Sequence, residues 1–267
     1  MALPGTGYVD VDGASLYYEQ TGTGPTLVLL HGFSFDTTVW DDQIDEFARK
    51  YRVLRYDLRG FGRSKSSEVG YTHAGDLKAL LDGLKIQEAY LAGLSLGGGA
   101  VINFALMYPG IARALILVAP SLGGFKWSSN FATAQASMQA KAREKGIEVA
   151  REIWMRQIIF RHAMNNKAVA ARLRKMVGGY SGWHWTHADL GKPLTPPAIG
   201  RLGEIRVPTL VLVGDADAPD QLQIADTLER SIPGARKVIF PGLGHLVNME
   251  EPVLFNDHVL KFLETVG

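Results

Sequence analysis

The stretch YLAGLSLGGGAVINFAL, residues 90–106, places one serine between apolar residues typical of a strand and a pattern typical of a helix. Four glycines surround Ser95: Gly93, Gly97, Gly98 and Gly99. Glycine inside a helix or strand costs about 0.5–1 kcal/mol relative to alanine, so the cluster needs a structural reason. The pattern G-x-S-x-G between a strand and a helix is that of a nucleophile elbow, a turn so sharp that neighbouring chain must pass without a Cβ clash. We therefore predict that Ser95 is a nucleophile at a helix N-terminus, which favours developing negative charge.

Short apolar segments alternate with helical patterns on both sides of this elbow. Strands are predicted at residues 14–20, 26–32, 51–57, 89–94, 112–120, 207–215 and 236–242. Helices are predicted at residues 37–50, 73–85, 98–108, 219–231 and 251–266. Nearly continuous apolar strands separated by helices indicate a mostly parallel sheet covered on both faces. The predicted fold class is therefore α/β, with a doubly wound sheet.

Residues 121–204 interrupt the alternation. This segment has helical patterns around 131–145, 147–162 and 166–177, and it holds four of the five tryptophans of the chain. We predict a core domain formed by residues 1–120 and 205–267, with residues 121–204 inserted as a mostly helical cap. Ligands of open α/β sheets bind at the carboxyl ends of the strands, where this cap is expected to lie.

Three tryptophans of the predicted cap are candidates for substrate binding: Trp127, Trp154 and Trp183. Large aromatic side chains commonly line ligand pockets. The alternative is that such side chains, with Phe160, only pack the cap onto the core, as large aromatic residues usually do.

Composition excludes several classes of function. The chain has 28 Lys and Arg against 27 Asp and Glu in 267 residues, a balance that argues against a nucleic-acid partner. It has no cysteine, which excludes a thiol nucleophile, disulfides and cysteine-ligated metals. Residues 89–112 carry no charge, but five glycines, Asn103 and Pro109 break the apolar pattern, so a membrane span is not expected. The start of the chain lacks the pattern of a secretory signal, and we expect a cytoplasmic protein, either a monomer or a homodimer.

A serine hydroxyl needs a base to take its proton, and the chain has seven histidines. His245 lies in the glycine-rich segment FPGLGHLVNMEEP, after a predicted strand and before the last predicted helix. Catalytic side chains are usually found on such loops. The other histidines are expected to pack, cap or lie at the surface: His31, His73, His162, His184, His187 and His258.

The histidine needs an acidic partner that fixes its tautomer, and the segment LVLVGDADAPD supplies three candidates. Asp215 follows the predicted strand so closely that its side chain is not expected to reach the histidine, and it remains the second candidate for the acid. Asp220 is expected to cap or begin the next helix. Asp217 is therefore the predicted acid, and the order Ser95, Asp217, His245 along the chain is the order of nucleophile, acid and base expected of this fold.

Two backbone N–H groups are predicted to form an oxyanion hole. One belongs to Leu96, directly after the serine, and the other to Phe33 in the segment LLHGFSFD, which follows an earlier predicted strand. His31 in the same segment is expected to brace this loop.

With these residues in place, the chain resembles the α/β-hydrolase superfamily. The resemblance depends on five segments in order: His31-Gly32, RYDLRGFGRS at 55–64, GLSLGG at 93–98, VPTLVLVGDAD at 207–217 and PGLGHLVNMEEP at 241–252. Within the superfamily the core is most similar to cap-bearing esterases and enol-lactonases of the kind that open 3-oxoadipate enol-lactone. Haloalkane dehalogenases and epoxide hydrolases of this fold resemble one another in using aspartate at the elbow, so Ser95 argues against both.

The predicted function is a serine hydrolase that cleaves small-molecule carboxylic esters or lactones through an acyl-enzyme, with no metal or cofactor. One alternative is a C–C bond hydrolase of vinylogous diketones, which resembles this scaffold and uses the same three residue types. The other is a ligand-sensing receptor that keeps the triad. Activity is expected to fall in acid as His245 gains a proton, because only neutral imidazole can accept the serine proton, and a pH–rate profile tests this.

Overall fold

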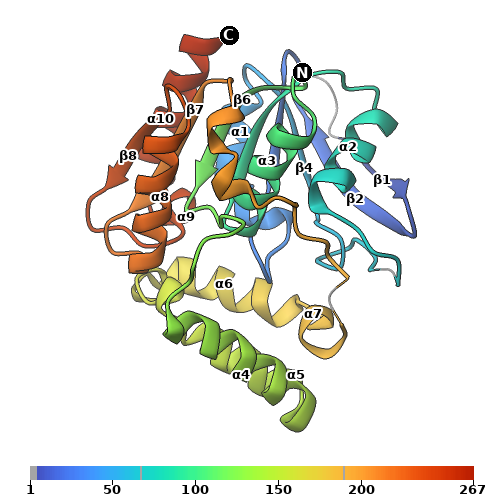
Figure 1. Cartoon of the computed structure of the whole chain (residues 1–267), viewed down its shortest axis with the longest axis vertical. Helices are drawn as coiled ribbons and strands as arrows, with labels where there is room; N and C mark the ends of the chain where they lie inside the picture. The colour runs from blue at the N-terminus through green and yellow to red at the C-terminus, as the bar shows by residue number, and fades with distance from the viewer. Residues whose placement is uncertain (1–4, 67, 189) are drawn as a thin grey trace.

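The computed structural model describes residues 5–66, 68–188 and 190–267, which form a sheet flanked by helices with a separate helical layer at one end (Figure 1). Within these residues one eight-stranded sheet has the order β1-β2-β4-β3-β5-β6-β7-β8. The strands are β1 (Gly5–Val11), β2 (Ala14–Thr21), β3 (Thr26–Leu30), β4 (Arg52–Tyr56), β5 (Ala89–Leu94), β6 (Ala112–Val118), β7 (Thr209–Gly214) and β8 (Arg236–Phe240).

The sheet is mostly parallel. Strands β3 to β8 pair in parallel, whereas β1 pairs antiparallel with β2 and β2 pairs antiparallel with β4. Every residue of β5 and of β7 is buried, so helices cover both faces of the central strands. This burial explains why those strands are continuous apolar segments, and the predicted α/β fold class is confirmed.

Two groups of helices pack against the sheet. One group contains α2 (His73–Gly83) and α3 (Leu96–Met107), and the other contains α1 (Asp41–Phe47), α9 (Val247–Glu250) and α10 (Pro252–Val266). Helix α8 (Pro219–Ser231) packs on β7 and β8. The predicted helix at 37–50 is a 3₁₀ turn, η1 (Thr37–Trp40), followed by α1, and the elbow helix α3 begins directly after Ser95.

The inserted segment forms four helices at the bottom of Figure 1. They are α4 (Ser129–Lys145), α5 (Ile147–Met155), α6 (Lys167–Gly179) and α7 (Trp183–Thr186), with 3₁₀ turns η2 (Ile158–Phe160) and η3 (Ala163–Asn165) between α5 and α6. The predicted helix at 147–162 ends at Met155 because Gln157 has extended backbone. Two further 3₁₀ turns, η4 (Ala198–Gly200) and η5 (Leu202–Glu204), lead back to β7 and contact α3 and α8.

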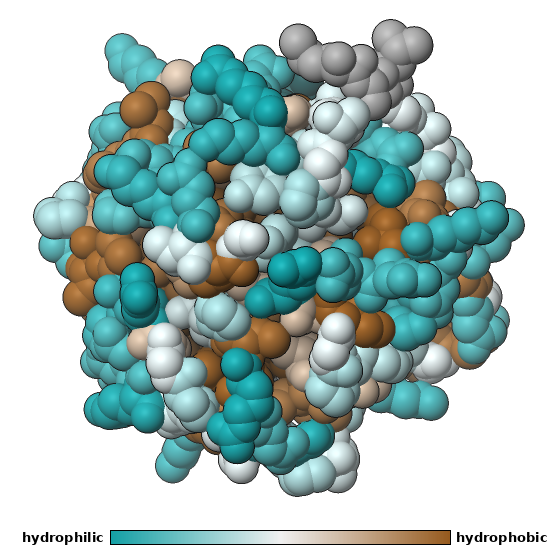
Figure 2. All heavy atoms as spheres, turned by 90° about the horizontal axis from the view of Figure 1, so that it is seen from above, coloured by the Kyte–Doolittle hydropathy of each residue, from teal (hydrophilic) through white to brown (hydrophobic). Residues whose placement is uncertain are grey.

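The uncharged segment at residues 89–112 is divided between β5, α3 and the start of β6. Across the described chain, no helix combines the length and the apolar character that a membrane span needs. The face opposite the inserted helices, seen from above in Figure 2, is mostly hydrophilic with smaller hydrophobic patches between the polar side chains.

Candidate active site

Ser95 lies at the turn between β5 and α3 with φ +52° and ψ −112°. A residue other than glycine in such a sparsely populated backbone region costs about 1–3 kcal/mol, so surrounding contacts must hold it. The Ser95 N–H donates to Val118 O at 2.9 Å, and Ser95 O accepts from Ser121 N at 2.9 Å and from Gly99 N at 3.1 Å. Strand β6, the residues directly after it and the first turn of α3 thus hold the backbone of Ser95 in place.

The glycines around Ser95 leave space for backbone atoms. A Cβ atom on Gly93 would lie 2.4 Å from Gly97 O, and one on Gly97 would lie 2.4 Å from Leu30 O. A Cβ on Gly98 would lie 2.5 Å from the Cβ of Pro120. Because backbone cannot move aside cheaply, glycine is required where the elbow passes β3 and its own helix.

His245 and Asp217 form a buried pair. The Nδ1 atom of His245 lies 2.8 Å from Oδ2 of Asp217, and the side chains are 1% and 0% exposed. An ionised carboxylate only accepts hydrogen bonds, so Nδ1 carries a proton, and the tautomer of the neutral ring that fits this bond has Nε2 as its acceptor. Asp215, the reserve candidate, is exposed and accepts from Gly242 N at 2.7 Å, so the structure brings Asp217 and not Asp215 to the histidine.

The segment after β7 is joined to the segment after β8 through backbone contacts. The Ala216 N–H donates to Leu243 O at 2.9 Å. A Cβ atom on Gly214 would lie 2.1 Å from the same carbonyl oxygen. This close approach places the two loops, and with them Asp217 and His245, side by side.

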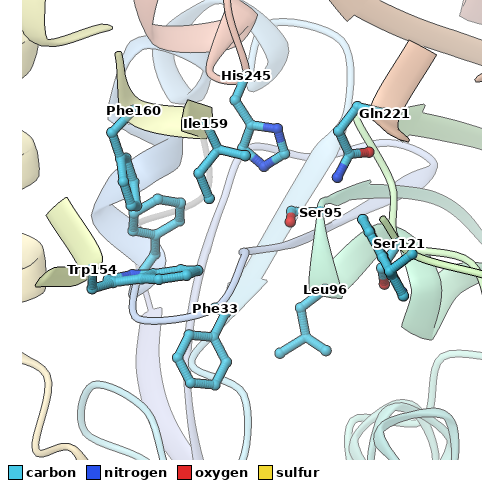
Figure 3. Close-up of a pocket in the computed structure, with 11 residues that line it drawn as sticks. Phe33, Ser95, Leu96, Ser121, Trp154, Ile159, Phe160, Gln221 and His245 are labelled. Carbon is cyan, nitrogen blue, oxygen red and sulfur yellow. The ribbon is translucent and has the colours of Figure 1, made fainter. Parts of the chain in front are cut away.

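Ser95 and His245 line the same cavity and face each other across it (Figure 3). The described chain has no hydrogen bond between the Ser95 hydroxyl and the His245 ring. Catalytic hydrogen bonds are often long or poorly aligned without substrate and shorten in the complex. The arrangement therefore places a hydroxyl and an imidazole ring at one cavity, without a direct bond between them.

The two predicted oxyanion donors, Phe33 and Leu96, also line this cavity. A Cβ atom on Gly32 would lie 3.3 Å from the Cβ of Ser95, so the loop before Phe33 packs directly on the serine. Leu96 is the first residue of α3, where the N–H has no intrahelical acceptor. Both N–H groups therefore belong to segments that meet at Ser95, as an oxyanion hole needs.

His31 braces the Phe33 loop. It is fully buried, its Nδ1 lies 2.7 Å from Gly32 O, and the Leu58 N–H donates to its Nε2 at 2.9 Å. Both bonds form only with a neutral ring that carries its proton on Nδ1. Burial lowers the pKa of His31 against the opposing effects of Asp57 and of the bond to Gly32, which favours that neutral form.

The cavity has a volume of about 200 Å³. Most of its lining is apolar or aromatic, and it consists of Phe33, Phe35, Ser95, Leu96, Ser121, Trp127, Trp154, Ile159, Phe160, Gln221 and His245. Trp127 and Trp154 are thus placed at the cavity. Phe35, Ser121, Ile159 and Gln221 were not singled out from the sequence, since no local motif marks them.

Trp183, the third tryptophan proposed from the sequence for substrate binding, is not among these lining residues. Its ring stacks on His187 with the centroids 5.3 Å apart and the planes at 10°. The short helix α7 places His184 and Trp185 on its buried side, with Trp183 only partly buried. A tryptophan in the cap is therefore no guide to the cavity unless its helix face is known.

The remaining histidines have packing or polar contacts away from Ser95. His184 is buried, stacks on Phe61 at 4.3 Å and lies 2.9 Å from Tyr180 Oη through its Nδ1. His162 is hydrogen-bonded to Glu250. In the part of the chain that the structure describes, no group of three or more His, Asp or Glu side chains is placed to hold a metal ion.

The chain is similar to known proteins over most of its length. Residues 27–258 match the profile of the Alpha/beta hydrolase family. The 2-hydroxy-6-oxononadienedioate/2-hydroxy-6-oxononatrienedioate hydrolase of Burkholderia vietnamiensis is 32% identical over 275 residues, which cover 96% of this chain and 94% of that protein.

Two solved structures are similar over almost the whole chain. A thermophilic esterase from Thermogutta terrifontis has a TM-score of 0.84 and 29% identity, with 98% of this chain and 99% of the other covered. The enol-lactonase from Burkholderia xenovorans LB400 has a TM-score of 0.78 and 27% identity, with 97% and 100% covered.

Proposed function

Because this chain belongs to the alpha/beta hydrolase family, we propose that it hydrolyses small carboxylic esters or lactones through an acyl-enzyme formed on Ser95. One observation carries the proposal. Ser95 and His245 open on the same cavity, and the buried Asp217 lies behind the histidine at 2.8 Å. Serine with a histidine base is suited to attack on an ester or lactone carbonyl.

In the acylation step, Ser95 Oγ bonds to the carbonyl carbon while its proton passes to Nε2 of His245. The carbonyl oxygen becomes negatively charged and accepts hydrogen bonds from the N–H groups of Phe33 and Leu96. The C–O bond to the alcohol then breaks, and the alcohol leaves with the proton from His245. Asp217 stabilises the imidazolium that exists between these two proton transfers.

In the second step, water attacks the acyl carbon and gives a proton to His245. The bond between Ser95 Oγ and the acyl carbon breaks, the serine oxygen regains the proton, and a carboxylic acid leaves. A lactone follows the same steps, with the alcohol and the acid remaining in one product.

The experiment is hydrolysis of p-nitrophenyl acetate, p-nitrophenyl butyrate and simple lactones by the wild type and Ser95→Ala. We expect multiple turnovers by the wild type and a loss of at least about 10³-fold in the variant. A phosphonate should add one adduct by mass to the wild type and none to Ser95→Ala. Wild-type rates in Ser95→Ala would contradict the assignment, and binding of ligands without turnover would favour a receptor.

A second candidate is C–C bond hydrolysis, which the 32% identity to a dienedioate hydrolase supports. A dienedioate carries two carboxylates, and among the described residues that line the cavity there is no Lys, Arg, Asp or Glu. Burying a carboxylate without a partner is costly. The uncharged lining thus favours neutral acyl groups. The cavity volume of about 200 Å³ is also smaller than the roughly 300 Å³ of the smallest pockets that hold drug-sized ligands.

The two candidates differ in the charge they require of the substrate. We expect p-nitrophenyl butyrate to be hydrolysed with kcat/KM about 100-fold above that of mono-p-nitrophenyl succinate, which has a carboxylate at the end of a chain of similar length. Turnover of a 2-hydroxy-6-oxo-dienedioate at a rate that exceeds butyrate hydrolysis would instead favour the C–C bond hydrolase.

A further inference from the structure

Two polar contacts between the inserted helices and the core end on the loops that carry the proposed catalytic groups. One joins Trp154 to Ser34, next to Phe33. The other joins His162 to Glu250, which binds the backbone on both sides of His245. Both contacts lie outside the triad and the oxyanion hole, and the effect on catalysis inferred for them below rests on the proposed function.

The first contact ends on the oxyanion loop. The indole Nε1–H of Trp154, on α5, donates to Ser34 Oγ at 2.6 Å, and both residues are buried. Ser34 has φ +65° within the turn that the Phe35 N–H closes onto Gly32 O at 3.3 Å. Since Ser34 directly follows Phe33 in this turn, the indole bond constrains the direction of the neighbouring peptide groups.

Ring contacts reinforce this bond. The rings of Phe33 and Trp154 meet edge to face with centroids 5.5 Å apart. Trp154 also packs edge to face on Phe160 at 5.3 Å, and all three side chains line the cavity (Figure 3). A ligand that presses on this wall therefore acts on the oxyanion loop as well.

The second contact ends on the histidine loop. Glu250 Oε2 accepts from Gly244 N at 2.8 Å, and Oε1 accepts from Leu246 N at 3.1 Å, so the carboxylate holds both neighbours of His245. The Glu250 side chain is only 3% exposed, and His162, between η2 and η3, is its cap partner. A Cβ atom on Gly244 would lie 2.6 Å from the Cβ of His162, so the cap packs tightly on this loop.

We propose that Trp154 and His162 are positioning residues, through which the docked cap holds the oxyanion loop by Ser34 and the histidine loop by Glu250. The cap then does more than enclose the substrate: its docking aligns the Phe33 N–H and the His245 ring relative to Ser95. Misplacement of about 1 Å at a catalytic group can cost about 100-fold in rate, so small changes at these contacts are measurable.

A third contact between cap and core supplies the matched control. Arg172 on α6 pairs with Asp42 on α1 and donates to Thr38 O in η1 at 3.3 Å, and neither Arg172 nor Asp42 lines the cavity. Arg172→Met therefore removes cap–core contacts whose core partners lie on η1 and α1, away from Ser34 and Glu250. We expect kcat and KM of this variant to stay within about twofold of wild type.

The test measures kcat, KM and the rate of Ser95 phosphonylation for Trp154→Phe, Ser34→Ala, the double variant, Glu250→Gln and His162→Phe. Trp154→Phe keeps an aromatic ring and removes the N–H donor. We expect each single variant to lose about tenfold in kcat and in labelling rate with KM within about threefold, and the Trp154→Phe/Ser34→Ala double variant to lose no more than the worse single one. If Glu250→Gln does not fold, His162→Phe alone tests the second contact.

Three results would overturn the proposal: a rise in KM with kcat and labelling unchanged, multiplying losses in the double variant, or an equal loss of kcat in Arg172→Met. Labelling of Ser95 needs only the nucleophile, the base and the oxyanion donors, so it reports on positioning even if esters are not the substrates. A wild type that labels rapidly but hydrolyses no ester or lactone would count against the proposed function alone.

Discussion

The Nδ1 atom of His245 lies 2.8 Å from the Asp217 carboxylate, and both side chains are almost fully buried. The carboxylate therefore sets the tautomer of the ring and leaves Nε2 toward the cavity that Ser95 lines. Asp217 also accepts from the Ala218 N–H at 2.6 Å, which fixes its own orientation.

Asp217→Asn tests this relationship. An amide can donate to Nδ1 and favour the wrong tautomer, so kcat should fall by about 10³–10⁴-fold with the fold retained. The measurement is ester hydrolysis together with circular dichroism. Asp215→Asn is the control, because the Asp215 side chain is exposed and accepts from Gly242 N, away from His245, and the kcat of this variant should stay within about threefold of wild type. Equal losses in the two variants would contradict the choice of acid.

Gly97→Ala tests the steric account of the elbow. Its Cβ would lie 2.4 Å from Leu30 O and 2.6 Å from His31 O, both backbone atoms, so we expect a loss of about 3 kcal/mol or more in the free energy of unfolding. Gly178→Ala in α6 is the control, because nothing lies within 4 Å of its Cβ position. That change should stabilise the protein by about 0.5–1 kcal/mol. Urea unfolding measures both, and a harmless Gly97→Ala would refute the close approach.

The buried His31 predicts a loss of stability in acid. Burial lowers the pKa of His31 in the folded protein, so the unfolded chain takes up the proton first as the pH falls. The stability that the neutral ring contributes is full above about pH 6.5 and declines below it, by at most about 1.4 kcal/mol per pH unit. His31→Gln should flatten the plot of unfolding free energy against pH below about pH 6.5. An unchanged slope would show that His31 is not the titrating group.

Trp127 and Trp183 should differ in their effect on substrate. Trp127 lines the cavity, whereas Trp183 stacks on His187 outside its lining. We expect Trp127→Ala to change kcat/KM for p-nitrophenyl butyrate by about tenfold or more, because it removes part of the apolar wall. Trp183→Ala should stay within about twofold. A larger effect of Trp183→Ala would mean that the ligand contacts residues beyond this cavity.

The element order of the core was predictable because its signals are local. The predicted strand at 89–94 and the predicted helix at 219–231 have those bounds in the structure. Strand β1 at Gly5–Val11 was missed, since it forms an antiparallel edge with alternating partial exposure and lacks a continuous apolar segment. The resemblance to cap-bearing α/β hydrolases is confirmed by the family match and by the esterase and enol-lactonase structures.

The candidate site was predictable only in part. The segments that carry Ser95, Asp217 and His245 could be identified because glycine loops after strands mark sites at one edge of a parallel sheet. The position of Trp183 outside the cavity lining could not be predicted, because the sequence does not say which side of the short helix α7 is buried.

The sequence by itself determined the α/β class, the elbow at Ser95 and the order of the three candidate catalytic residues, because hydrophobic period and glycine spacing act within a few residues. Only the tertiary structure decided which side chains of the inserted helices reach the cavity and that Trp154 and His162 contact Ser34 and Glu250. The contacts of those two residues join positions 120 and 88 residues apart, and they depend on how whole helices pack. No local pattern records that packing.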